Sequence, residues 1–121
     1  MSGASRGLLD TSAVTDLGEL LIESLPDEPL ISAVTLAELS VGPLVARNES
    51  ERSARQAHLQ QAEADFDPLP FDAASARAFG RVAAALRSAG RKPAAGRKPT
   101  ARAYDALIAA TAIANRLPLY T

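Results

Sequence analysis

Short apolar runs alternate with helix-length segments along the chain, and this alternation limits the possible folds more than any other feature. Four runs have the length and composition of strands: "RGLLD" (6–10), "LISAVT" (30–35), "PLPF" (68–71) and "RLPLYT" (116–121). The segments between them show helical spacing or a helix-prone composition, and they cover residues 11–25, 36–48, 50–65, 73–90 and 102–114. Strands that alternate with helices favour an α/β sandwich around a mainly parallel sheet.

Glycine and proline sharpen these boundaries. We expect the helix over 36–48 to be interrupted near Gly42-Pro43, and the helix over 73–90 to stop at Gly90. The prolines of 68–71 suit only an edge strand or a strand start. Residues 90–99 contain the tetrapeptide GRKP twice and are typical of a flexible basic loop.

Composition excludes several classes of protein. A chain of 121 residues is one domain that can bury a core without disulfides. Cysteine is absent, so thiolate metal sites and cysteine nucleophiles are excluded. No apolar run approaches the roughly 20 residues that span a bilayer, and the first ten residues lack the architecture of a signal peptide. We therefore expect a soluble cytoplasmic protein that does not enter a membrane.

The net charge of −1 hides a strong asymmetry. Residues 1–72 carry 13 acids and four cations, a balance of −9, whereas residues 73–121 carry nine cations and one acid, a balance of +8. This split indicates an anion-binding side, with nucleic acid among the candidates, unless the opposite charges intermingle in the fold.

Two acids follow the first two predicted strands. Asp10 ends the run 6–10 and would stand at the carboxyl edge of the sheet, where ligands bind in open α/β folds; alternatively, it caps the next helix. Glu38 fits a capping box with Thr35, and this box would also put a carboxylate at the sheet edge.

Asp105 stands in the otherwise apolar segment "RAYDALIAATAIA" (102–114). At helical spacing it shares a stripe with Ile108, Ala109, Ala112 and Ile113, and Thr100 is the better candidate for the N-cap. An ionised carboxylate that faces a core needs a cation or hydrogen-bond donors, so a metal ion or a cation from another helix is expected beside it.

Asp10, Glu38 and Asp105 would form an all-oxygen site, since the single histidine, His58, lies in the polar segment 50–65 and is expected to be solvated. Such sites select Mg²⁺ or Mn²⁺, which suits phosphodiester hydrolysis. Cations just before Asp105 would hold phosphates, or would simply form a solvated loop: Arg87, Arg91, Lys92, Arg97, Lys98 and Arg102. Two other readings stay open: an aspartyl-phosphate phosphatase, which would need a second Asp where Ser12 stands, and a non-enzymatic binding module.

Three segments together resemble the PIN domain of VapC-type toxins, the ribonucleases of toxin–antitoxin pairs: "LLDTSAV" (8–14), "TLAEL" (35–39) and "DALIAATAIANRLPLYT" (105–121). The resemblance implies a three-layer α/β/α fold, an endoribonuclease that depends on Mg²⁺ or Mn²⁺, a homodimer, and a VapB-type antitoxin as inhibitor. It implies Asp10, Glu38 and Asp105 as metal ligands, with the hydroxyl of Thr11 or Ser12 in support. The family pattern also includes a further Asp beyond "LYT", past Thr121, the last residue of this single PIN-like domain.

Overall fold

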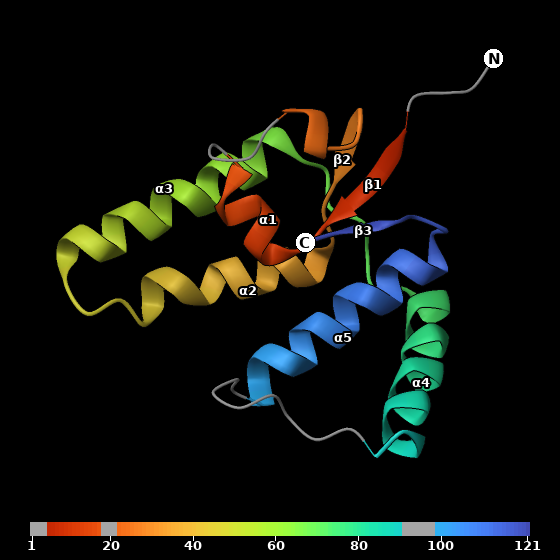
Figure 1. Ribbon diagram of the computed structural model, residues 1–121. Helices are drawn as coiled ribbons and strands as arrows, with labels where there is room; N and C mark the ends of the chain where they lie inside the picture. The colour runs from red at the N-terminus through yellow and green to blue at the C-terminus, as the bar shows by residue number, and fades with distance from the viewer. Residues whose placement is uncertain (1–4, 18–21, 91–98) are drawn as a thin grey trace.

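The computed structural model describes residues 5–17, 22–90 and 99–121, and these form three strands, five α-helices and one 3₁₀ helix (Figure 1). In chain order the elements are β1 (Arg6–Leu9), α1 (Thr11–Thr15), η2 (Ile22–Ser24), β2 (Glu28–Leu30), α2 (Ala33–Leu44), α3 (Glu49–Asp65), α4 (Ala73–Ser88), α5 (Pro99–Ala114) and β3 (Leu119–Tyr120). None of the helices in these ranges is long and apolar enough to cross a membrane.

The sheet is parallel and has the order β2-β1-β3. Leu8 of the central strand pairs with Leu30 on one side and with Leu119 on the other. Leu8 and Leu9 point to opposite faces of the sheet, and both side chains are fully buried. Burial on both faces is typical of a parallel sheet between two helical layers, so the predicted α/β class is confirmed.

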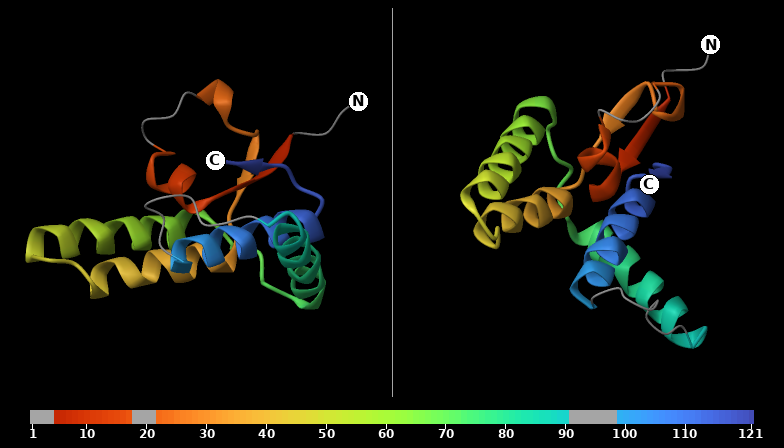
Figure 2. Two further views of the ribbon diagram at one scale, coloured as in Figure 1. Left: turned by 60° about the horizontal axis from the view of Figure 1, so that its bottom comes forward. Right: turned by 60° about the vertical axis from the view of Figure 1, so that its left-hand side comes forward.

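Each face of the sheet has its own core. Leu9 packs with Ala13, Val14, Ile31 and Ala62, so α1, α2 and α3 cover one face. On the other face Leu8 packs against the α5 residues Ile108 and Ala112, together with Val34 of α2. Figure 2 shows the two helix pairs, α2 with α3 and α4 with α5, that flank the sheet, in agreement with their packing contacts.

The start of α2 differs from the prediction. The strand predicted over 30–35 is wrong beyond Leu30, because Ser32 is the N-cap of α2 and its Oγ accepts a hydrogen bond of 3.0 Å from the Thr35 backbone N–H. Thr35 is therefore the third residue of the helix, and the predicted capping box of Thr35 with Glu38 is wrong. Helix α2 is thus capped by Ser32, one turn before Thr35, the residue that the sequence pattern favoured as the cap.

Three other boundaries also differ. Helix α2 continues through Gly42-Pro43 and ends at Leu44, so the predicted interruption is wrong and the helix ends one residue after Pro43. The segment 68–71 forms only an isolated bridge between Leu69 and Ser32. The first helix ends at Thr15 and a 3₁₀ turn covers Ile22–Ser24, while residues 18–21 lie outside the described residues.

The other three predicted helices are confirmed, and the segment 102–114 lies within α5. The polar segment 50–65 forms α3, where Glu51 accepts i,i+4 contacts from Arg47 and Arg55. Asp72 caps α4, and Gly90 follows that helix in the left-handed region at φ 63°, as a helix-terminating glycine should.

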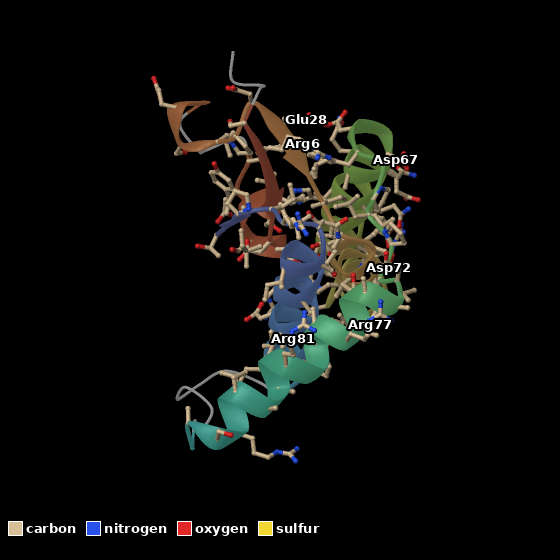
Figure 3. All side chains as sticks on the ribbon, turned by 90° about the vertical axis from the view of Figure 1, so that its right-hand side faces the viewer. Arg6, Glu28, Asp67, Asp72, Arg77 and Arg81 are labelled. Carbon is tan, nitrogen blue, oxygen red and sulfur yellow. The ribbon has the colours of Figure 1, made fainter. Side chains whose placement is uncertain are left out.

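The charge asymmetry persists in three dimensions. Each ion pair between described residues joins two members of the acidic segment 1–72, such as Arg6 and Glu28 on neighbouring strands at 3.5 Å. The arginines of α4 are exposed, and Figure 3 shows Arg77 and Arg81 along one side of that helix, beyond its cap Asp72.

Candidate active site

An open pocket of about 350 Å³ lies at the carboxyl edge of the sheet, and every described residue that lines it carries a side-chain oxygen. We call it the carboxylate pocket. Its lining comes from the end of β1, from α1, α2 and α5: Asp10, Thr11, Ser12, Thr15, Asp16, Glu38 and Asp105. The three acids predicted to converge, nearly a hundred positions apart at their extremes, therefore line one pocket.

Asp10 is held by the start of α1. It follows β1 directly, and its Oδ1 accepts hydrogen bonds of 2.9 Å from the Ala13 backbone N–H and from Ser12 Oγ. Asp10 therefore both caps α1 and lines the pocket, because α1 begins at the carboxyl end of the central strand. These bonds use Oδ1, so Oδ2 is the oxygen that they leave for a ligand.

Glu38 is positioned by a chain of hydroxyl groups. Thr11 Oγ1 donates a hydrogen bond of 2.6 Å to Glu38 Oε1 and lies 3.4 Å from Thr35 Oγ1. Thr35 Oγ1 is in turn 3.4 Å from Ser32 Oγ, and both of these side chains are fully buried. The short bond joins α1 to α2 and orients a half-buried carboxylate toward the pocket.

Asp105 lies on an exposed part of α5, so the expectation that it faces the core is wrong. The buried side of α5 is centred on Ile108, Thr111 and Ala112, whereas Ile113 is 51% exposed. With 3.6 residues per turn, Asp105 lies at the edge of that buried side. This edge of α5 borders the carboxylate pocket. The helix begins at Pro99, so Thr100 belongs to its first turn and is not its N-cap.

Asp16 is a fourth acid in the pocket, and the sequence reasoning did not identify it. It is the C-cap of α1, immediately after a helix of five residues. The sequence predicted a longer helix, over 11–25, in which Asp16 is an internal residue. The sequence feature that could have identified Asp16 is its position six residues after Asp10. A short helix between the two acids keeps both of them near the carboxyl end of β1.

The donor set of the pocket fits a hard divalent cation. Among the described residues its lining offers carboxylates and hydroxyls and no nitrogen or sulfur side chain. Among the described residues, no group of three acids or histidines is already drawn together as a metal cage. Mg²⁺ keeps several waters and needs only one or two direct carboxylates, so the arrangement fits a partly hydrated ion.

The remaining candidates are placed as follows. Arg102 is half-buried on α5, three residues before Asp105, and Arg87 is exposed in the last turn of α4. Arg91, Lys92, Arg97 and Lys98 lie outside the described residues. His58 is half-buried and lines a separate pocket between α1 and α3, so the expectation that it is simply solvated is wrong.

Comparison with known proteins agrees with this geometry. Residues 8–121 match the PIN domain family. Ribonuclease VapC5 of Mycobacterium tuberculosis (strain ATCC 25618 / H37Rv) is 39% identical over 118 residues, which cover 95% of this chain and 81% of that protein.

Solved structures show the same fold. The crystal structure of VapBC-5 from Mycobacterium tuberculosis, a member of the VapBC family of toxin–antitoxin systems, contains a chain with a TM-score of 0.80 and 36% identity over 95% of this chain and 82% of that one. A chain of FitAcB from Neisseria gonorrhoeae has a TM-score of 0.65 and 26% identity, with coverage of 93% and 84%. VapBC2 from Rickettsia felis, bound to promoter DNA, is similar in fold alone, at a TM-score of 0.69 and 20% identity.

Proposed function

The chain belongs to the PIN-domain family, and from that premise we propose that it is a cytoplasmic endoribonuclease, the toxin of a toxin–antitoxin pair. The observation that carries the proposal is the carboxylate pocket, in which Asp10, Glu38 and Asp105 meet at the carboxyl edge of the sheet. In an α/β fold this edge is where ligands bind. The resemblance to a ribonuclease at 39% identity supplies the substrate class.

We propose that Asp10, Glu38 and Asp105 hold Mg²⁺ or Mn²⁺. When bound, such an ion activates water and neutralises charge on a phosphodiester. Asp10 is anchored through one oxygen by Ser12 and Glu38 through one oxygen by Thr11, so the other oxygen of each can serve as a ligand. Anchoring of this kind lowers the conformational freedom that a ligand loses on binding.

The RNA backbone would be held by cations next to this pocket. Arg102 is one helical turn from Asp105, and residues at this spacing share a helix face. We propose that Arg102 contacts a phosphate, and that Arg87 with Arg91, Lys92, Arg97 and Lys98 extends this contact.

We also propose two protein partners. A chain of the VapBC-5 structure, a member of a toxin–antitoxin family, is 36% identical to this chain, which favours a VapB-type antitoxin as the inhibitor. The second partner is another copy of this chain, which would form a homodimer. Light scattering of the purified chain would test this.

One experiment tests the activity. Purified chain is incubated with a mixed-sequence RNA in Mn²⁺, with and without EDTA, and the products are resolved on a denaturing gel. We expect cleavage only without EDTA, and we expect the substitution Asp105→Asn to abolish it. Asp67→Asn is the matched control, because Asp67 is exposed and lies outside the carboxylate pocket. Equal cleavage by Asp105→Asn and the parent chain would refute the assignment.

The second candidate function is an RNA- or antitoxin-binding module without cleavage. It is favoured by the exposed arginines of α4, which can bind an anionic partner without any metal ion. Under this alternative RNA binding persists unchanged in EDTA and no cleavage occurs in Mn²⁺, so the same experiment separates the two functions.

A further inference from the structure

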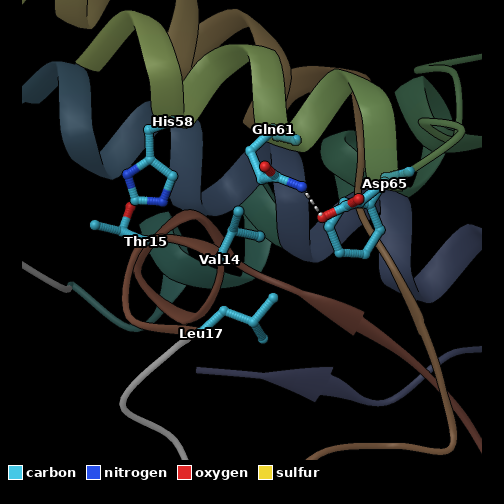
Figure 4. A pocket seen from close by; sticks show the side chains of 8 residues that line it. Val14, Thr15, Leu17, His58, Gln61 and Asp65 are labelled. Carbon is cyan, nitrogen blue, oxygen red and sulfur yellow. Dashed lines mark hydrogen bonds between the residues drawn. The ribbon is translucent and has the colours of Figure 1, made fainter. Parts of the chain in front are cut away.

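A second pocket, of about 290 Å³, lies between α1 and α3, and we call it the α1–α3 pocket. Its walls are largely apolar, and three polar side chains of α3 stand at its edge (Figure 4). The apolar walls are Val14, Leu17 and Phe66, and the polar edge is His58, Gln61 and Asp65. Pockets for drug-sized ligands begin at about 300 Å³, so this one suits a single ring system rather than a whole helix.

The two pockets are adjacent, since Thr15 lines both of them. Thr15 Oγ1 donates a hydrogen bond of 2.9 Å to the Thr11 carbonyl, which fixes the side chain against its own helix. In Figure 4 the His58 ring points toward Thr15 from the opposite side of the α1–α3 pocket. A ligand larger than the carboxylate pocket can therefore extend past Thr15 to the α1–α3 pocket.

The polar edge of the α1–α3 pocket is fixed and rich in acceptors. Gln61 Nε2 donates a hydrogen bond of 2.8 Å to Asp65 Oδ2, and this bond joins the two side chains one turn apart on α3. The bond does not use Asp65 Oδ1 or Gln61 Oε1, which are both acceptors. Acceptors of this kind match the amino groups of guanine, adenine and cytosine, whereas uracil presents carbonyl oxygens on both sides of its single N–H.

We propose that the α1–α3 pocket is a base-binding subsite, which takes the nucleobase next to the phosphate held in the carboxylate pocket and disfavours uracil. This inference rests on the proposed function, because it supplies the substrate class. Single-stranded RNA is recognised in this way, by stacking an unpaired base on a side chain and reading its edge with hydrogen bonds. An apolar protein side chain could fill the same volume, but it would make no use of the Gln61–Asp65 pair.

Binding of small probes tests the proposal without any cleavage. The full chain is labelled with ¹⁵N and titrated in Mg²⁺ with AMP, GMP, CMP and UMP, and with ribose 5-phosphate as a probe that lacks a base. We expect AMP, GMP and CMP to shift the backbone amides of Val14, Leu17 and Gln61, with UMP weaker by about three- to tenfold, the range of one to two hydrogen bonds. Ribose 5-phosphate should shift only amides of the carboxylate pocket.

Gln61→Leu and Gln60→Leu are matched variants, because Gln60 is exposed on the same helix and does not line the pocket. Gln61→Leu should weaken GMP about three- to tenfold and leave ribose 5-phosphate unchanged, and Gln60→Leu should change neither.

The proposal is overturned if nucleotides and ribose 5-phosphate shift the same amides, or if no nucleotide reaches the α1–α3 pocket. It is also overturned if N-acetyl-leucinamide shifts those amides and no nucleotide does, since the pocket would then suit a protein side chain. Because no step depends on cleavage, an inactive chain would refute the proposed function and still give an answer about this pocket.

Discussion

Replacement of Thr11 by valine would isolate the hydrogen bond that positions Glu38. Valine has nearly the shape of threonine and lacks the hydroxyl, so Thr11→Val removes the 2.6 Å bond to Glu38 Oε1 with little change in packing. The carboxylate would keep its charge and its place on α2, but it would gain rotational freedom at the edge of the carboxylate pocket.

The size of the effect follows from that one bond. A hydrogen bond to a charged group contributes about 1.5–3 kcal/mol, and loss of an outer contact to a metal ligand typically weakens metal binding by about 10–100-fold. The two estimates agree, because 1.4 kcal/mol corresponds to about a factor of ten in an equilibrium constant. We therefore expect the Kd for Mn²⁺ to rise by about 10–100-fold in Thr11→Val.

Isothermal titration of the purified chain with Mn²⁺ measures this change, and thermal unfolding of the same samples checks that the variant is folded. Thr11→Ser keeps the hydroxyl and should bind Mn²⁺ within about threefold of the parent chain. If Thr11→Val binds Mn²⁺ as tightly as the parent while Glu38→Gln binds weakly, the hydroxyl has no positioning role. If Glu38→Gln also binds normally, Glu38 is not a ligand.

Three further predictions concern folding. In Gly7→Ala the new Cβ would overlap the Tyr120 ring, so we expect a loss of about 1–3 kcal/mol in chemical denaturation; an unchanged midpoint would contradict the strand packing. Gly80→Ala, in open space on α4, should instead gain about 0.5–1 kcal/mol, and a loss there would show that α4 is packed differently. The Ser75 backbone N–H lowers the pKa of Asp72, so the stability that Asp72 contributes is fully present above the ordinary aspartate pKa of about 3.9 and is lost as the pH falls through its lowered pKa. The stability gap to Asp72→Ala should close as acid is added, and a gap independent of pH would disprove the cap.

The sequence was most informative where local pattern and topology agree. "RGLLD" predicted both the central strand and an acid at its carboxyl end, and the structure has β1 followed by Asp10 in the carboxylate pocket. Parallel strands end at one edge, so acids that follow them converge whatever the details of the helices. The same rule covers Glu38, which lies in the helix that follows β2, although its predicted capping box was wrong. Asp105 does not follow a strand and reaches the pocket from α5, although its predicted buried stripe was wrong.

Other features depend on contacts that a linear pattern does not contain. The first turn of α2 begins after Ser32, because that fully buried serine finds its donor in the Thr35 N–H; several β-branched residues in a row had suggested a longer strand. Asp16 reaches the pocket only because α1 stops after Thr15. The role of His58 in lining a pocket depends on the packing of α3 against α1, two helices more than 30 residues apart along the chain.

The isolated bridge between Ser32 and Leu69 has a consequence for how molecules of this protein meet one another in solution. It pairs the backbone just beyond β2, on the outer side of that strand, and the prolines on either side of Leu69 have no N–H to offer. A flat row of unpaired amides at that position would invite a strand from a second molecule. Here Leu69 pairs with this row of backbone groups, and its two neighbouring prolines offer no N–H for further pairing. This arrangement protects the edge against the strand-to-strand association that leads to aggregation.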